Sequence, residues 1–126
     1  MKIMATIGVI VVAVIHIAIS IVEIFFWKNP SVHQRLDFTA ELATKVYPIV
    51  QNAGLYNSFI AAGLIWGAFA KSNSLSVRVF FLMCVVIAGI FGAFTLKGTT
   101  LVLQTIPASV ALICVWLSRN QVKPQV

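Results

Sequence analysis

Residues Ile3 to Val22 read IMATIGVIVVAVIHIAISIV, and this stretch contains no charged side chain. An α-helix needs about 20 apolar residues to cross the roughly 30 Å hydrocarbon core of a bilayer. Runs of similar character return at Val46 to Ala70, Val79 to Leu96 and Gly98 to Ser118. The sequence therefore predicts an all-α membrane protein with four transmembrane helices.

The composition supports the same class. Of the 126 residues, 60% are hydrophobic and 10% are charged, whereas about a quarter of the residues in a soluble domain are charged. Four crossings use nearly the whole chain, so we expect residues 1–126 to form one domain. The net charge of +6 comes from Lys and Arg placed singly at helix ends. This placement argues against nucleic acid as a partner and favours membrane lipid.

The first helix is predicted to run from Ile3 to Trp27, with Trp27 as an anchor at the membrane surface. The only long connection lies between Lys28 and Lys45. Apolar residues at helical spacing predict a short amphipathic helix on the membrane surface in this region: Phe38, Leu42, Val46 and Val50.

The second predicted helix ends at about Ala70. The third spans about Ser76 to Leu96, and the fourth ends at Leu117. The turns between them are short, which predicts antiparallel neighbours in an up-down bundle. Small residues at near-regular spacing would let helices approach closely, within one chain or in a homo-oligomer: Gly63, Gly67, Cys84, Ala88, Gly92, Ala108 and Ala111.

Orientation is judged from the positive residues near the helix ends. Five lie on the side of the termini, namely Lys2, Lys71, Arg78, Arg119 and Lys123. Four lie on the other side, namely Lys28, Arg35, Lys45 and Lys97. The positive-inside rule favours cytoplasmic termini by this margin of one.

Polar side chains within the predicted spans are the most informative feature for function. Each costs about 2 to 3 kcal/mol in hydrocarbon and therefore needs a partner or a purpose. His16 is placed near the bilayer centre, and the others fall in the half nearest the long connection. The predicted ligand-binding residues are His16, Glu23, Asn52, Tyr56, Asn57 and Gln104.

Helical spacing predicts how these residues meet. One stripe on the first helix comprises His16, Ser20, Glu23 and Trp27, and one on the second comprises Asn52, Tyr56, Phe59 and Gly63. If the stripes face each other, Glu23 would accept hydrogen bonds from Asn52 or Tyr56. Pro107 would leave the Leu103 carbonyl without its helical donor, beside Gln104. Together these features predict a polar pocket, with the surface helix as its lid.

A second interpretation stays open, because Asn, Gln, His and Tyr also join helices to one another within membranes. Metal binding is not expected, since His16 and Glu23 are two turns apart and His33 is the only other imidazole. Ser20, His16 and Glu23 lack the turn and oxyanion donors of a hydrolase. Glycine-rich phosphate loops are absent. We therefore predict no catalytic residue, metal or cofactor.

The segment Gln51-Asn52-Ala53-Gly54-Leu55-Tyr56-Asn57 resembles a family of small bacterial membrane proteins, the domain of unknown function number thirteen hundred and four. The likeness extends to His16 with Glu23, to Phe26-Trp27 and to Gln104-Thr105-Ile106-Pro107-Ala108. It implies a four-span fold in the bacterial cytoplasmic membrane and supplies no reaction.

A more distant similarity is to the membrane-associated eicosanoid and glutathione metabolism proteins. Their second helix also carries polar residues like Gln51-Asn52. However, Leu55 stands where their acidic residue would be expected, and the arginines that would hold glutathione are missing.

These observations lead to a functional hypothesis with two alternatives. The first is a non-enzymatic membrane protein that binds or passes a small amphiphilic or cationic ligand, with Glu23 as the charged group. The second is an enzyme of the glutathione and eicosanoid type that acts on a lipid-soluble substrate, with Tyr56 or His16 as acid or base. The third is a structural or assembly subunit of a membrane complex.

Overall fold

The computed structural model describes residues 2–119, and all the regular elements within them are helical. The all-α prediction is confirmed for this range. Lys123, which was counted for orientation, lies outside the described residues. In chain order the elements are α1 Lys2–Ile21, η1 Val22–Phe26, α2 Pro30–His33, η2 Gln34–Leu36, α3 Ala40–Phe69, α4 Ser74–Thr95, η3 Leu101–Thr105 and α5 Ile106–Arg119.

Three continuous helical segments are long and apolar enough to cross a membrane: Lys2–Phe26, Ser74–Thr95 and Leu101–Arg119. They agree closely with three of the predicted crossings. The remaining long helix, α3, has 30 residues. Its polar residues Asn52 and Asn57 dilute its apolar character, so a crossing by α3 stays a prediction.

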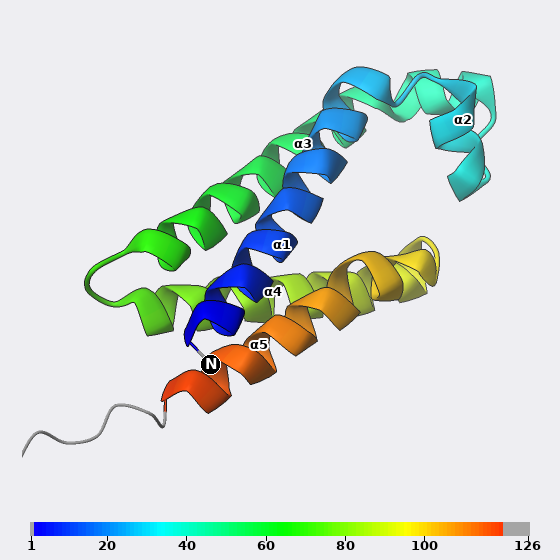
Figure 1. The fold of residues 1–126 in the computed structure, drawn as a ribbon. Coiled ribbons are helices and arrows are strands. Elements are labelled where there is room, and N and C mark those ends of the chain that lie inside the picture. The colour runs from blue at the N-terminus through cyan, green and yellow to red at the C-terminus, as the bar shows by residue number, and fades with distance from the viewer. Residues whose placement is uncertain (1, 120–126) are drawn as a thin grey trace, which may run out of the picture.

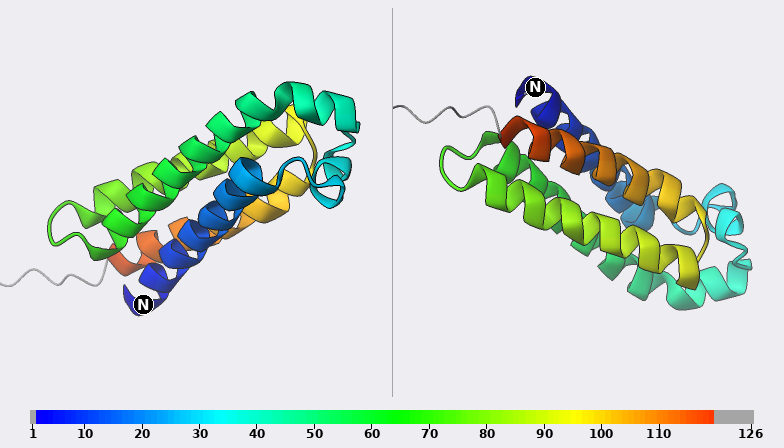
Figure 2. Two further views of the ribbon diagram at one scale, coloured as in Figure 1. Left: turned by 90° about the horizontal axis from the view of Figure 1, so that it is seen from above. Right: turned by 90° about the horizontal axis from the view of Figure 1, so that it is seen from below.

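The long helices pack in a closed order. α1 contacts α3 and α5, and α4 contacts the same two helices from the other side (Figure 2). The beginning of α1 and the end of α5 lie at the same end of the molecule, which we call the terminal end (Figure 1). The opposite end, called the connection end, holds residues 27–39 and the turn at residues 96–100.

The prediction of an amphipathic surface helix through Phe38, Leu42, Val46 and Val50 is wrong. The connection contains only the short elements α2 and η2, and α3 begins at Ala40, where the Thr39 hydroxyl accepts from the Leu42 N–H at 3.2 Å. The apolar positions at Leu42 and Val46 are therefore the first turns of α3. Pro48 lies inside this helix, which continues through it to Phe69; the proline removes the backbone hydrogen bond to the Thr44 carbonyl.

Trp27 is also placed differently from the prediction. Its side chain is 4% exposed and packs edge-on against Phe38, with the ring centroids 5.3 Å apart. The indole Nε1–H donates to the Ala43 carbonyl at 3.0 Å. Trp27 thus fastens the end of the first helix to the start of α3, because an indole can pack its apolar ring and satisfy its single donor at once.

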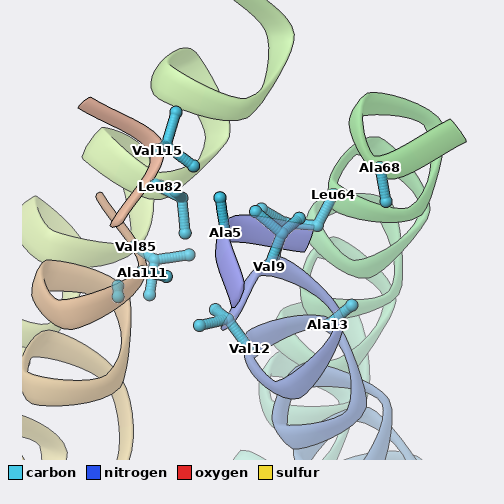
Figure 3. Close-up of a cluster of buried hydrophobic side chains, with 11 residues drawn as sticks. Ala5, Val9, Val12, Ala13, Leu64, Ala68, Leu82, Val85, Ala111 and Val115 are labelled. Carbon is cyan, nitrogen blue, oxygen red and sulfur yellow. The ribbon is translucent and has the colours of Figure 1, made fainter. Parts of the chain in front are cut away.

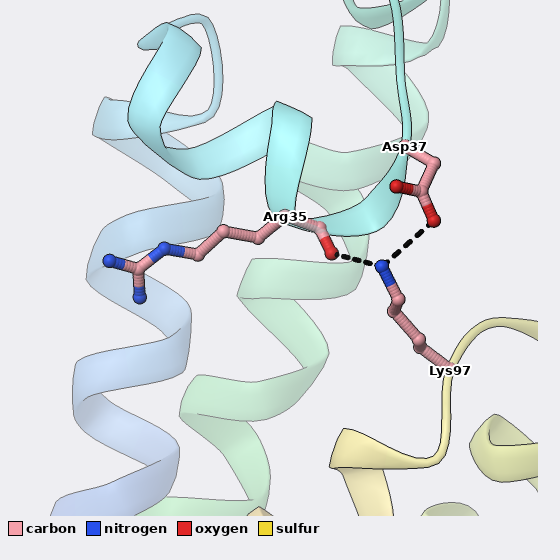
Figure 4. Close-up of polar contacts among 3 residues, drawn as sticks. All are labelled: Arg35, Asp37 and Lys97. Atoms are coloured by element: carbon pink, nitrogen blue, oxygen red, sulfur yellow. Dashed lines mark hydrogen bonds and ion pairs between the residues drawn. The ribbon is translucent and has the colours of Figure 1, made fainter.

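A polar clasp joins the two sides of the connection end. Lys97, in the turn after α4, extends its Nζ to Asp37 Oδ2 and to the Arg35 carbonyl, each at 2.8 Å (Figure 4). The side chains of Lys97 and Asp37 are 41% and 79% exposed. An exposed pair of this kind contributes only about 0.2 to 1 kcal/mol, so the clasp orients the connection more than it stabilises the fold.

The hydrophobic core is formed by the halves of the long helices nearest the terminal end, and Figure 3 shows its buried side chains between the helices. All four long helices contribute to it, and most of the contributing side chains are Ala or Val. Small side chains let helix backbones approach closely, which is how helices gain packing energy in lipid. The buried members are Ala5, Val9, Val12, Ala13, Leu64, Ala68, Leu82, Val85, Ala108, Ala111 and Val115.

Arg78 closes the C-terminus of α3. Its Nε donates to the Gly67 carbonyl and a terminal guanidinium nitrogen donates to the Ala68 carbonyl, both at 2.8 Å. The Ser74 hydroxyl also donates to Gly67. The last carbonyls of a helix have no intrahelical partner and carry partial negative charge, so a guanidinium satisfies both needs.

Candidate functional site

Glu23 is the centre of the candidate site. It lies in η1, a π-helical stretch near the end of the first helix, and its side chain is half-buried. Asn57 on α3 donates from Nδ2 to Glu23 Oε2 at 2.8 Å. Short π-helical segments inside α-helices occur frequently at functional sites.

Gly54 makes the close approach at Glu23 possible. A Cβ at this position would lie 2.7 Å from Ile24 Cγ1, 3.0 Å from Glu23 Cβ and 3.1 Å from the Ser20 carbonyl oxygen. Any larger residue would push α3 away from the first helix. Gly54 therefore sets the distance across which Asn57 reaches the carboxyl group. The sequence motif contained this glycine, but its role depends on the partner helix.

The carbonyl of Ile24 is held by two side chains from α3. The Tyr47 hydroxyl donates to it at 2.8 Å and Gln51 Nε2 donates at 3.3 Å. A π-helical turn shifts backbone pairing by one residue, so carbonyls in it are available to other donors. Sequence reasoning missed Tyr47 and Gln51 as site residues. Tyr47, Gln51 and Gly54 follow the i, i+4, i+7 spacing of one helix face, and this spacing was the available signal.

His16 lies on the buried face of α1, as predicted, and is 2% exposed. Its Nδ1 is 2.9 Å from the Val12 carbonyl oxygen. Because a carbonyl only accepts, Nδ1 carries a proton and donates it to Val12. Ser20, one turn further on, is also buried. His16 and Glu23 thus share the inward stripe, with Ser20 between them.

Asn52 and Tyr56 do not join the site. Asn52 is exposed, and Tyr56 is 59% exposed and packs edge-on against Phe59 on the outer surface of α3. The predicted inward stripe of this helix is therefore wrong for Asn52, Tyr56 and Phe59, and only its last member, Gly63, is buried. Its buried face follows Gly54, Ala61, Leu64 and Ala68 instead, because the glycine and alanines permit close packing against α1 and α4.

Gln104 is half-buried in η3, the second π-helical stretch, which directly precedes Pro107. The Ile106 N–H donates to the Leu101 carbonyl, five residues earlier. This irregularity agrees with the expectation that Pro107 disturbs backbone pairing here. The neighbouring Thr105 hydroxyl is buried without a hydrogen bond and packs directly on Gly89 of α4. No hydrogen bond joins Gln104 to Glu23 among the residues described.

The site thus unites Glu23 and Asn57, with His16 and Ser20 deeper on the same helix face. Within residues 2–119, no group of three or more His, Cys, Asp or Glu side chains could hold a metal ion. The ion pair between Lys97 and Asp37 does not involve Glu23. The site can therefore offer a carboxyl group and an amide to a hydrogen-bond donor or a cation.

Comparison with known proteins supplies the family. A model of the family described as "Protein of unknown function (DUF1304)" matches residues 10–116. No curated protein and no solved structure matches the chain. The family assignment rests on this match. The more distant similarity is corrected by it, because the eicosanoid and glutathione metabolism proteins are not the family that matches. The chain belongs to the DUF1304 family of proteins of unknown function.

Proposed function

We propose that this chain is a four-span membrane protein that binds a hydrophobic organic cation at Glu23. The site would lie in the half of the bilayer nearest the connection end, and both termini would be cytoplasmic in a bacterial inner membrane. The observation that carries the proposal is the half-buried Glu23 carboxyl in an apolar helix. Its one hydrogen-bond donor among the described residues is the neutral amide of Asn57.

A fourth crossing, by α3, is supported by the positions of its two ends relative to the two ends of α4. The clasp from Lys97 to Asp37 places the start of α3 near the end of α4. The hydrogen bonds from Arg78 to Gly67 and Ala68 place the end of α3 near the start of α4. If α4 crosses a membrane, the two ends of α3 belong on opposite sides of it. Its 30 residues give about 45 Å of helix, more than a crossing needs.

A cation is the ligand that this site favours. A carboxylate in an apolar helix is costly when it has no positive partner, and in membrane proteins such residues commonly mark a ligand or ion pathway. Large apolar side chains, Val22, Phe25 and Phe26, are exposed beside Glu23. They would contact the apolar part of an amphiphilic ligand. Tyr56, one of the two acid or base candidates of the enzyme hypothesis beside His16, is exposed on the outer face of α3 and gives that alternative no support.

The test is binding of tetraphenylphosphonium to the purified protein in detergent, measured by calorimetry. We expect Glu23→Gln to weaken binding at least about tenfold, or about 1.4 kcal/mol, because the amide keeps the size of the side chain and its ability to accept from Asn57. Glu41→Gln, at an exposed position in the first turn of α3, is the matched control and should leave affinity unchanged.

Neutral triphenylphosphine oxide, of similar shape, should bind poorly to both forms of the protein. Equal affinity of wild type and Glu23→Gln for the cation would contradict the proposal, provided that both proteins show the same helical circular dichroism. That result would leave Glu23 and Asn57 as a contact that holds α1 against α3.

A further inference from the structure

The outer face of α3 carries a polar group where a membrane helix would be expected to be apolar. Asn52 is exposed on this face, and the aromatic residues Tyr56, Phe59 and Trp66 continue it toward the terminal end. No hydrogen bond of the Asn52 side chain occurs within residues 2–119. Tyr56 and Phe59 already contact each other edge-on, with centroids 6.1 Å apart.

The depth of Asn52 makes this exposure costly. With α3 crossing as proposed, Lys45 of α3 and Lys28, which lies over the Tyr47 ring, would mark the level of the membrane surface. Asn52 follows Lys45 by seven residues, or about 10 Å of helical rise. An amide facing lipid at that depth has neither water nor protein to bond to, so a partner of suitable chemistry is favoured there.

The small residues that could have served an oligomer are mostly used within the chain. Gly63 packs against Phe81 and Gly67 against Arg78, while Gly92 packs against Thr100. Ala108 and Ala111 belong to the buried core. Most of the small residues predicted to form a contact between copies are therefore buried between helices of one chain and are not free for such a contact. The Asn52 face of α3 is left as the contact surface that has hydrogen-bonding chemistry.

We propose that this face binds a second copy of the same chain, with Asn52 opposite Asn52. Copies inserted in the same orientation are related by an axis along the membrane normal, so identical residues lie at identical depth. A carboxamide both donates and accepts, and two of them at one depth can form a reciprocal pair of hydrogen bonds. A different protein or a lipid would need a matching group at that level, whereas a second copy supplies it automatically.

The aromatic residues would extend this contact. Phe59 lies seven residues after Asn52, which is two helical turns along the same face. In a symmetric dimer Phe59 of one copy therefore lies close to Phe59 of the other. Packing of aromatic side chains would add contact area on the terminal side of the amide pair. The inference rests on the proposed crossing by α3, and it is independent of cation binding at Glu23.

Disulfide crosslinking in lipid vesicles at low protein density tests this arrangement. In a background with Cys84→Ala and Cys114→Ala, Phe59→Cys should form a dimer of twice the 13.7 kDa chain mass when oxidised. Ile87→Cys is the matched control, because Ile87 is 61% exposed on α4 and lies at a similar depth. We expect it to crosslink several-fold less. Adding Asn52→Leu to Phe59→Cys should lower crosslinking at least fivefold, and Asn52→Gln should restore part of it.

Equal crosslinking at positions 59 and 87, or no effect of Asn52→Leu, would overturn the inference. Labelling the same Phe59→Cys vesicles with a water-soluble maleimide distinguishes a failure of the proposed crossing by α3 from a failure of the proposed dimer. Rapid labelling would refute the crossing by α3 and the dimer together. Protection from labelling without crosslinking would refute the dimer alone.

Discussion

At the scale of single residues, Gly54 determines the geometry of the candidate site. The backbone of α3 comes so close to the first helix at this point that a methyl group would meet Ile24, Glu23 and the Ser20 carbonyl. Asn57, nearly one turn further along, then reaches Glu23. The absence of a side chain at Gly54 thus permits the hydrogen bond between Asn57 and Glu23.

Gly54→Ala should destabilise the protein. An added methyl at 2.7 Å from Ile24 Cγ1 cannot be accommodated without separating the helices, which costs about 1 to 3 kcal/mol. This cost exceeds the gain of roughly 0.5 to 1 kcal/mol from replacing a helical glycine by alanine. Thermal unfolding in detergent, followed by circular dichroism, measures the difference.

Gly98→Ala is the control for Gly54→Ala. An added Cβ at Gly98 meets nothing within 4 Å, and its backbone does not adopt a positive φ. Its melting temperature should stay close to that of the wild type. Equal melting temperatures for all three proteins would show that the approach at Gly54 is not tight.

At the scale of elements, α3 is the helix with the most varied environment. Its first turns pack on Trp27 through the Ala43 carbonyl, its middle contacts η1, and its end is capped by Arg78. Irregular turns occur at η1, which contacts α3, and at η3, which contacts α4. Both lie in the half nearest the connection end, while the tightly packed core lies toward the terminal end. The π-helical turns and the hydrogen bond between Glu23 and Asn57 therefore lie in the same half of the molecule.

Arg78→Met should loosen the end of α3. The substitution removes two charge-assisted hydrogen bonds to the Gly67 and Ala68 carbonyls, and we expect a loss of about 1 to 2 kcal/mol in the free energy of unfolding. Arg78→Lys should recover only part of it, because an ammonium lacks the planar fork that reaches both carbonyls. Hydrogen exchange of the last turn of α3, measured by mass spectrometry, should rise in Arg78→Met.

Lys71→Met is the matched control, because Lys71 is an exposed cation in the connection between α3 and α4, close to the end of α3. If it accelerated exchange as much as Arg78→Met does, the effect would come from net charge at the membrane surface. The hydrogen bonds of Arg78 would then not be the cause.

At the scale of the whole molecule, the packing order of the four long helices determines which ends lie together. The connection between the first helix and α3 meets the turn between α4 and η3 through the Lys97 clasp (Figure 4). The turn between α3 and α4 lies at the other end, with the start of α1 (Figure 1). The two ends of α3 therefore lie at opposite ends of the molecule, as those of α4 do.

Single cysteines can test this topology. In the Cys84→Ala and Cys114→Ala background, Ser31→Cys in α2 and Ser72→Cys after α3 should be labelled by a membrane-impermeant maleimide from opposite sides of sealed vesicles. Both positions are exposed. Labelling of both from the same side would show that α3 does not cross, and the four-span proposal would fail.

The sequence by itself determined the helical class, the three helices apolar enough to cross a membrane and the inward stripe of His16 and Ser20, because these depend on local hydropathy and on one helical period. It could not decide which face of α3 points inward. The stripe through Asn52 and Tyr56 and the stripe through Gly54 and Ala61 are both regular. Only the tertiary structure chose between them, since the close approach at Gly54 depends on the surface that the first helix presents to it. That rotation brought Asn57 to Glu23, and it left Asn52 on the outside.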